Sequence, residues 1–179
     1  MMIKELPLQG LLLFEPKVFN DERGYFFESY NSVIKNAIGE YDFVQDNESF
    51  SKKNVLRGMH FQNPPFEQGK LVRVVSGRVS DVVIDIRKNS STYGQWFEIE
   101  LNSELKQMLW IPPGFAHGFL TLTDNTTFLY KCTKVYNAQS ESGVIWNDSL
   151  IEINWKTNTP LVSEKDLKLP SLKDLISPF

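Results

Sequence analysis

Hydrophobic and polar residues alternate along much of the chain, and this alternation is its strongest local signal. In Val82–Arg87 the apolar residues Val82, Ile84 and Ile86 take every second position, and in Phe97–Leu101 the apolar residues alternate with two glutamates. Successive side chains of a β-strand point to opposite faces, so a period of two is typical of a strand with one face in the core. Both segments are therefore predicted to be strands buried on one face.

Turn signals between the apolar runs predict further strands and very little helix. Lys70–Val75 and Val79–Arg87 flank Ser76-Gly77-Arg78, which indicates a short hairpin. Further strands are expected at Gly24–Tyr30, Asn54–Gln62, Gln107–Ile111, Gly118–Thr123, Thr126–Val135 and Gly143–Trp146. Only Ser32–Ile38 and Ser171–Ile176 have the pattern of a short helix. Many short strands with few helices favour an all-β sandwich or barrel, which can enclose one small ligand.

Composition and charge narrow the classes of partner. The chain has 179 residues, of which 41% are hydrophobic and 23% charged, and no linker divides it, so residues 1–179 are expected to form one domain. A net charge of −3 argues against a nucleic-acid or membrane partner, so a phosphate-bearing ligand would be held by a few local cations. No apolar run approaches the ~20 residues that span a bilayer. The single cysteine, Cys132, excludes an intrachain disulfide and fits a reducing compartment, so a cytoplasmic protein is expected.

One predicted strand carries an unusual group of polar residues. The run LRGMHFQ, Leu56–Gln62, contains Arg57 and His60, although burying several polar groups is costly without a purpose. His60 could be a hydrogen-bonded core histidine or a functional one. Strict alternation places Arg57 and His60 on opposite faces of the strand. Gly58 between them predicts a bulge that turns both toward one cavity.

His117 is the only other histidine, so the chain offers few ligands for a metal site. His117 follows a Pro-Pro-Gly turn and shares a strand face with Phe119, so it is either structural or part of a pocket with His60. Metal-binding barrels usually supply several imidazoles and a carboxylate, whereas this chain has two histidines, no H-x-H pair and only Glu67 as an added candidate. No metal and no cofactor are therefore expected. Acid–base chemistry remains, since imidazole titrates near neutral pH.

Three further residues could take part in such chemistry. Alternation places Tyr130 with Phe128 on an apolar strand face. Tyr130 is therefore either a partner for a histidine or an ordinary core tyrosine. Lys70 opens a strand whose inward positions include Val72, so it points into a barrel mouth or lies on the surface. Asp166, in SEKDLKLP, reads on composition alone as a solvated loop residue.

Eight motifs, in order along almost the whole chain, resemble the dTDP-4-dehydrorhamnose 3,5-epimerase family. They are DERGYFFESYN (Asp21–Asn31), FVQDNESFS (Phe43–Ser51), VLRGMHFQ (Val55–Gln62), QGKLVRVVSG (Gln68–Gly77), QWFEIEL (Gln95–Leu101), LWIPPGFAHGF (Leu109–Phe119), TFLYKCT (Thr127–Thr133) and IWND (Ile145–Asp148). The resemblance implies a metal-free, cupin-like jelly-roll β-barrel with a few short helices. It also implies a homodimer with exchanged N-terminal strands, in which the N-terminal segment of one subunit completes the partner's site.

The resemblance also implies a substrate and roles for individual residues. The substrate would be a dTDP-linked 4-keto-6-deoxy sugar, inverted at C3 and C5 without a cofactor. His60 would be the proton acceptor with Asp166 as its orienting carboxylate, Tyr130 the proton donor, and Lys70 would lie near the keto oxygen. The implied substrate-binding residues, of which Tyr136 would stack on the thymine, are Arg23, Glu28, Gln45, Asp46, Asn47, Arg57, His117, Tyr136, Glu141 and Lys165.

Three pocket positions depart from the usual family pattern. Met59 and Phe61 stand in place of leucine and tyrosine, and Val135 stands where a tyrosine is common. These changes leave the implied catalytic set intact but leave sugar and nucleotide specificity open. The alternatives are an enzyme that inverts C3 only, an epimerase of another nucleotide-linked keto sugar, and a non-catalytic cupin that binds a nucleotide sugar. A metal-dependent cupin oxygenase is a weaker alternative.

Overall fold

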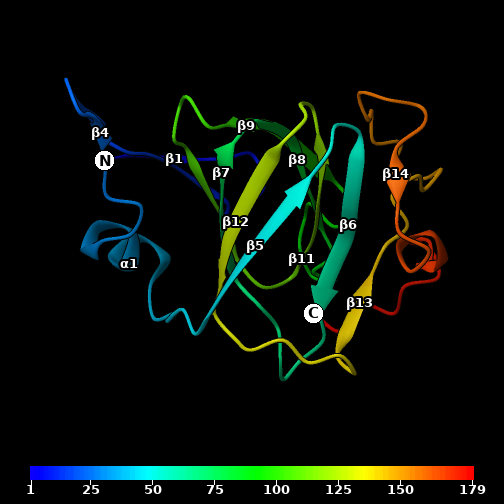
Figure 1. Ribbon diagram of the computed structural model, residues 1–179. Helices are drawn as coiled ribbons and strands as arrows, with labels where there is room; N and C mark the ends of the chain where they lie inside the picture. Colours follow the sequence, from blue (N-terminus) through cyan, green and yellow to red (C-terminus); the bar gives the residue numbers. More distant parts are fainter.

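The computed structural model of the protein describes residues 1–179 and consists mainly of two facing β-sheets (Figure 1). The first sheet runs in the order β1 (Met2–Glu5), β2 (Leu12–Glu15), β10 (Met108–Ile111), β7 (Lys70–Ser76), β12 (Thr126–Cys132) and β5 (Gln45–Ser51). The second runs β13 (Glu141–Gly143), β6 (Val55–Gln62), β11 (Phe115–Thr121), β8 (Arg78–Asp85) and β9 (Trp96–Asn102), and β14 (Leu161–Val162) pairs parallel with β6. The prediction of an all-β barrel is confirmed.

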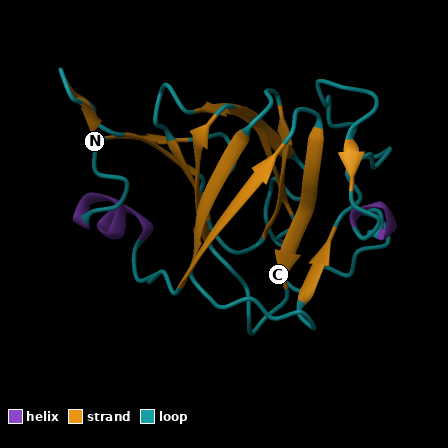
Figure 2. Ribbon diagram, viewed as in Figure 1, coloured by secondary structure: helices purple, strands orange, loops and turns teal.

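The remaining elements are a separate hairpin and two short helices. The hairpin joins β3 (Phe19–Asp21) and β4 (Gly24–Phe26). Helix α1 (Ser32–Ile38) and the 3₁₀ helix η1 (Asp166–Lys168) lie on opposite sides of the barrel (Figure 2). The predicted helix Ser32–Ile38 is confirmed.

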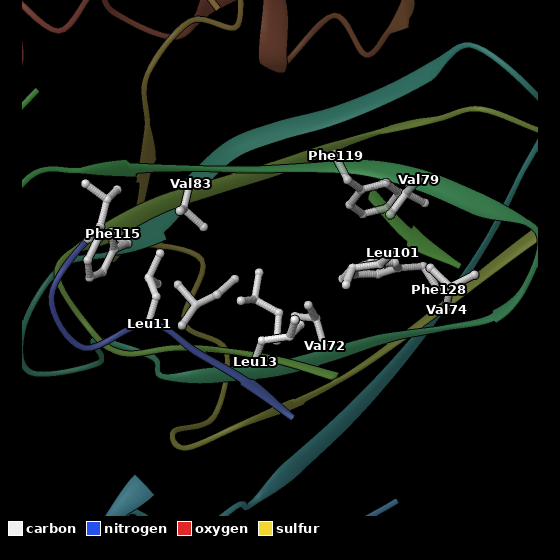
Figure 3. Packing of buried hydrophobic residues seen from close by; sticks show 13 residues of the cluster. Leu11, Leu13, Val72, Val74, Val79, Val83, Leu101, Phe115, Phe119 and Phe128 are labelled. Atoms are coloured by element: carbon white, nitrogen blue, oxygen red, sulfur yellow. The ribbon is translucent and has the colours of Figure 1, made fainter. Parts of the chain in front are cut away.

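The main core fills the space between the two sheets. Val72 of β7 and Val79 and Val83 of β8 are fully buried there, and Phe119 and Phe128 stack at a centroid distance of 4.1 Å. Figure 3 shows these side chains pointing toward one another from the two sheets. Strands β7 and β8 contribute every second residue to this layer, as the alternation predicts.

The prediction that strands are buried on one face only is wrong for β8. Val82 and Ile84 point away from the barrel interior, yet both are fully buried. The chain that follows β13 packs Ile151 and Trp155 against them, which covers the outer face of the second sheet. Helix α1 covers part of the first sheet in the same way, with Ile34 packed in a cluster of its own.

The prediction of a hairpin at Ser76-Gly77-Arg78 is also wrong. Strand β7 pairs with β10 and β12, whereas β8 pairs with β9 and β11, so the turn carries the chain from one sheet to the other. Gly77 has a φ of +82°, and a side chain there would clash with Thr123 and Thr126. A tight turn therefore does not by itself determine that its flanking strands pair.

Several elements differ from the prediction in extent or in kind. The helix predicted at Ser171–Ile176 is only a turn, closed by hydrogen bonds from the Asp174 and Leu175 amides to the Ser171 carbonyl. The strand expected over Gly24–Tyr30 ends at Phe26, and the one expected at Gly143–Trp146 is Glu141–Gly143. Strand β5 was not predicted, because its sequence QDNESFS is almost entirely polar.

Candidate active site

A cavity of about 400 Å³ opens between the two sheets at one end of the barrel. Several of the residues singled out from the sequence contribute to its wall. They are Arg57, His60, Lys70, His117, Tyr130, Glu141, Lys165 and Asp166. Apolar walls come from the adjoining core, including Phe119 and Phe128. The cavity therefore lies where the inner rows of the two sheets change from apolar to polar.

A bulge in β6 brings Arg57 and His60 to the same face, as predicted from Gly58. His60 pairs with His117 of β11, and Arg57 pairs with Phe119, so two residues of β6 lie opposite one residue of β11. Gly58 has a φ of +128°, which L-residues rarely adopt. The extra residue shifts the alternation by one position, and both side chains line the cavity.

Asp166 is bonded to His60 inside the cavity. His60 Nε2 lies 2.7 Å from Asp166 Oδ1, and the Gly58 amide donates to Oδ2 over 3.1 Å. The interpretation of Asp166 as a solvated loop residue is wrong, since it is 3% exposed. The pairing of β14 with β6 carries the following residues into place, and the Asp166 amide donates to Ser163 Oγ.

The contacts of Asp166 keep it ionised. Burial alone would raise its pKa, but the hydrogen bond and charge of His60, together with the Gly58 and Ser163 hydrogen bonds, lower the pKa overall. An ionised Asp166 accepts the Nε2 proton of His60, so the lone pair of the imidazole is then on Nδ1. His60 is thus oriented as a base.

Tyr130 and Lys70 reach the cavity from the facing sheet. Tyr130 is on β12 and pairs in register with Val72 of β7, two residues beyond Lys70. Burial raises the pKa of Tyr130 above its usual value, so the phenol stays protonated. Burial lowers the pKa of Lys70, against the charges of Cys132, Asp81 and Glu141. Lys70 lines both this cavity and an adjoining smaller one, so its side chain points into the barrel mouth rather than out to solvent.

His117 forms a second histidine–carboxylate pair behind the cavity. Its Nε2 lies 3.0 Å from each carboxylate oxygen of Asp81, and both side chains are buried. The sequence reasoning missed Asp81. The available signal was a charged residue at an inward position of an alternating strand, between Val79 and Val83.

A smaller adjoining cavity of about 230 Å³ collects another group of predicted residues. It shares His60, Lys70, Tyr130 and Glu141 with the larger cavity and adds Gln45, Asn47 and Tyr136. The Tyr136 amide donates to Gln45 Oε1 over 2.8 Å, and Gln45 Nε2 donates to Asn47. Glu141 is paired with Lys165 and accepts a hydrogen bond from Tyr136. The two cavities therefore adjoin each other along the four residues that they share.

Three predicted binding residues lie outside both cavities. Arg23, with 85% of its side chain exposed, pairs with Asp21 on the β3–β4 hairpin. Glu28 accepts a hydrogen bond from Asn31 at the start of α1, and Asp46 pairs with Lys131 over 2.9 Å. Figure 1 shows β4 and α1 on the far side of the first sheet from β6.

The structure was also searched for a metal-binding cluster and for a membrane-spanning helix. Nowhere do three or more His, Cys, Asp or Glu side chains gather closely enough to hold a metal ion, and Glu67 pairs with Lys134 over 2.6 Å. None of the helices is long and apolar enough to cross a membrane.

Comparisons with known proteins agree on one group of enzymes. The family model described as dTDP-4-dehydrorhamnose 3,5-epimerase matches residues 5–174. The dTDP-4-dehydrorhamnose 3,5-epimerase of Salmonella typhimurium is 51% identical over 175 residues, which cover 96% of each chain. The crystal structure of a dTDP-6-deoxy-D-glucose-3,5-epimerase from Legionella pneumophila in complex with dTDP-4-keto-L-rhamnose is 41% identical, with a TM-score of 0.93 and coverage of 97% and 94%. A 3′-monoepimerase of Streptomyces bikiniensis in complex with dTDP-quinovose is 31% identical, with a TM-score of 0.89 and coverage of 94% and 86%.

Proposed function

The chain belongs to the dTDP-4-dehydrorhamnose 3,5-epimerase family, and we propose that His60, Tyr130, Lys70 and Asp166 carry out the family's reaction in the larger cavity. The protein is an epimerase with a cupin-like jelly-roll fold. It inverts C3 and C5 of dTDP-4-dehydro-6-deoxy-D-glucose to give dTDP-4-dehydro-L-rhamnose. The observation that best supports these residues is the position of His60 and Tyr130 on facing sheets of one cavity.

Inversion of each carbon needs a base and an acid on opposite sides of the sugar ring. The hydrogens on C3 and C5 are both α to the C4 ketone, so one base and one acid can serve both carbons. His60 takes the proton through Nδ1, which leaves an enolate with its charge on the C4 oxygen. Tyr130 then donates its phenolic proton to the other face of the carbon, and exchange with solvent restores both groups.

Lys70 and Asp166 support these two proton transfers. The Lys70 ammonium, on the Tyr130 side of the cavity, stabilises the enolate oxygen. One well-placed donor to a developing oxyanion contributes about 2.7–4 kcal/mol elsewhere. Asp166 holds the tautomer of His60 and stabilises the imidazolium that forms, as the carboxylate of a catalytic triad does.

We assign the nucleotide to the smaller cavity and the sugar to the larger one. Tyr136 offers an exposed ring on which a thymine can stack, and Glu141 and Lys165 offer polar groups to its edge. Arg57 is exposed toward the cavity and offers a planar fork to the diphosphate. Gln45, Asn47 and His117 complete the binding set.

A homodimer that exchanges N-terminal segments is part of the proposal. Arg23, Glu28 and Asp46 lie outside the cavities of their own chain, so a partner subunit would have to bring Arg23 and Glu28 to a site. The β3–β4 hairpin also exposes Tyr25 and Phe26 by more than half, as a surface buried by a partner would. Co-expressed Arg23→Ala and His60→Ala chains should regain activity that neither has alone, because one site of the mixed dimer has both residues. No recovery would contradict the shared site.

The decisive experiment is turnover of dTDP-4-keto-6-deoxyglucose in D₂O. Deuterium should enter both C3 and C5, and His60→Ala should slow both exchanges by about 10²–10⁴-fold. Lys156→Ala, which removes an ion pair to Glu98 outside both cavities, serves as the control and should retain full exchange. Unchanged exchange in His60→Ala would show that His60 is not the base.

The same experiment tests the second candidate, an epimerase that inverts C3 only. The related 3′-monoepimerase has nearly the same fold, so fold alone does not separate the two activities. Deuterium at C3 alone would favour it, and better turnover of another nucleotide-linked keto sugar would indicate a different substrate. No turnover of any keto sugar would favour a non-catalytic binding protein. A cytoplasmic location stays a prediction, supported by the single free thiol of Cys132.

A further inference from the structure

Arg57 is the one arginine in the wall of the larger cavity, and no carboxylate of the cavity neutralises it. The two carboxylates that line the same cavity are already paired, Asp166 with His60 and Glu141 with Lys165. The side chain of Arg57 is exposed toward the cavity. A long charged side chain without an ion pair samples many rotamers in water. Binding an anion has to stop this motion, which costs affinity.

One contact from the neighbouring strand restrains the Arg57 side chain. Nε of Arg57 donates a 3.2 Å hydrogen bond to Oγ of Ser51, the last residue of β5. Ser51 is 4% exposed and does not line either cavity, so it cannot touch a substrate directly. Because β5 belongs to the first sheet and β6 to the second, this hydrogen bond joins the two sheets beside the cavity.

The corner between β5 and β6 is itself fixed by hydrogen bonds. Ser51 pairs with Thr126 of β12 at the end of the β5 ladder. At the start of β6, the Val55 amide donates to Oγ1 of Thr121 over 3.0 Å, and the same hydroxyl donates to the carbonyl oxygen of Lys52. Thr121 is fully buried, so water does not compete for these bonds. The Ser51 hydroxyl therefore has a fixed place beside β6.

The hydrogen bond to Ser51 also decides which edge of the Arg57 guanidinium faces a ligand. An arginine grips an anion bidentately either through Nε and one terminal nitrogen or through its two terminal nitrogens. With the Nε–H of Arg57 taken by Ser51, the edge formed by Nη1 and Nη2 remains for the anion. The contact thus selects one of two binding geometries before the ligand arrives.

We propose that Ser51 is a positioning residue, which holds Arg57 so that its two terminal nitrogens meet the diphosphate of the substrate. The inference rests on the proposed function for the identity of the anion, whereas the restraint on Arg57 belongs to the free protein. Ser51 takes no part in the proton transfers, so Ser51→Ala should raise KM and leave kcat nearly unchanged.

The direct test is the solvent exchange of the Arg57 Nε–H proton, followed by NMR of the free ¹⁵N-labelled protein and assigned with Arg57→Lys. A proton held in a hydrogen bond exchanges slowly, so Ser51→Ala should speed its exchange by about tenfold or more. Ser51→Thr keeps the hydroxyl and should keep the exchange slow. Equal rates in wild type and Ser51→Ala would overturn the proposal. So would exchange in the wild type as fast as that of free arginine, a result that needs no variant to fold.

Binding of dTDP, measured by calorimetry, is the second readout. Ser51→Ala should bind dTDP about 3–10-fold more weakly, because binding now has to order the Arg57 side chain, but should bind thymidine, which has no diphosphate, like the wild type. Ser80→Ala is the matched control, since Ser80 is a buried strand serine whose hydroxyl donates to Glu98 outside both cavities. It should leave dTDP affinity unchanged. Equal dTDP affinity of Ser51→Ala and wild type would overturn the proposal.

A double-mutant cycle separates positioning from a purely structural role of Ser51. In an Arg57→Met background, Ser51→Ala should change dTDP affinity little, since the group that Ser51 holds is absent. An equal loss in both backgrounds would show that Ser51 acts on the stability of the corner alone, and would overturn the proposal. Failure of the wild-type protein to turn over the keto sugar would refute the proposed function, but not the restraint on Arg57 that the proton exchange measures.

Discussion

Replacing Gly58 with alanine tests the bulge on which the site depends. The Gly58 backbone faces Gly118 on the neighbouring strand, and a Cβ at residue 58 would lie 2.5 Å from Gly118 Cα and 2.8 Å from the His117 carbonyl oxygen. Both atoms belong to the backbone, so no side-chain rotation can relieve the contact. Gly58→Ala must therefore push β6 and β11 apart or change the φ of +128° that forms the bulge.

The cost can be estimated from these two effects. Forcing extra volume into a packed region costs about 1–3 kcal/mol, and a strained φ costs about 1–3 kcal/mol. Together they amount to about 2–6 kcal/mol, a large fraction of a typical stability of about 5–15 kcal/mol. For a chain of this length, the melting temperature should fall by roughly 5–20 °C. The variant should also lose activity by about 10²-fold, because Arg57 and His60 flank the bulge.

Thermal unfolding and the D₂O exchange assay measure the two effects. Gly39→Ala is the control, because Gly39 also has a positive φ, of +78°, but a Cβ at residue 39 would meet no other atom within 4 Å. It should show only the backbone cost, about 1–3 kcal/mol, and keep full activity. The reasoning would be refuted if Gly58→Ala melted within a few degrees of Gly39→Ala and exchanged deuterium at the wild-type rate.

Three further predictions concern single side chains. Asp166→Asn keeps the shape of the His60 contact but removes its charge, so kcat should fall by about 10²–10⁴-fold while calorimetry shows little change in dTDP affinity. Burial raises the pKa of Asp85, but hydrogen bonds from Arg87, Ser90 and Thr92 lower it overall, from 3.8 to about 2. Its stabilisation, about 2 kcal/mol, is present above pH 4 and lost as the pH falls through 2, so acid unfolding of Asp85→Asn should lack this part of the pH dependence. Tyr136→Ala should weaken dTDP binding by about 1–3 kcal/mol through lost stacking, whereas Tyr136→Phe should bind nearly as tightly as wild type in the same titration.

The sequence predicted individual strands better than their partners. The alternation in β8 marks it as a strand, but an apolar residue beneath the C-terminal chain looks locally the same as one between the sheets. The turn at Gly77 reads as a hairpin because nothing in its neighbourhood records that β7 and β8 belong to different sheets. Strand β5 lacks an apolar face because its inward side chains, Asn47 among them, meet a cavity rather than the core.

The same distinction between local and distant information applies to the site. His60 and Arg57 could be found because polar residues in a buried strand are costly, and Gly58 between them indicated how both could face one cavity. Asp166 could not be found in this way. It is 106 residues from His60, and its burial depends on the pairing of β14 with β6. Only the resemblance of the whole chain to a family indicated its partner.

Burial has opposite consequences for the two groups that reach the cavity from the first sheet. An apolar environment favours the neutral form of any side chain, so it raises the pKa of Tyr130 and lowers the pKa of Lys70. A neutral phenol is what a proton donor needs, and the barrel supplies it without further groups. A neutral amine would be a poor partner for an enolate, so the role proposed for Lys70 requires its ammonium form, which burial disfavours and the neighbouring charges favour.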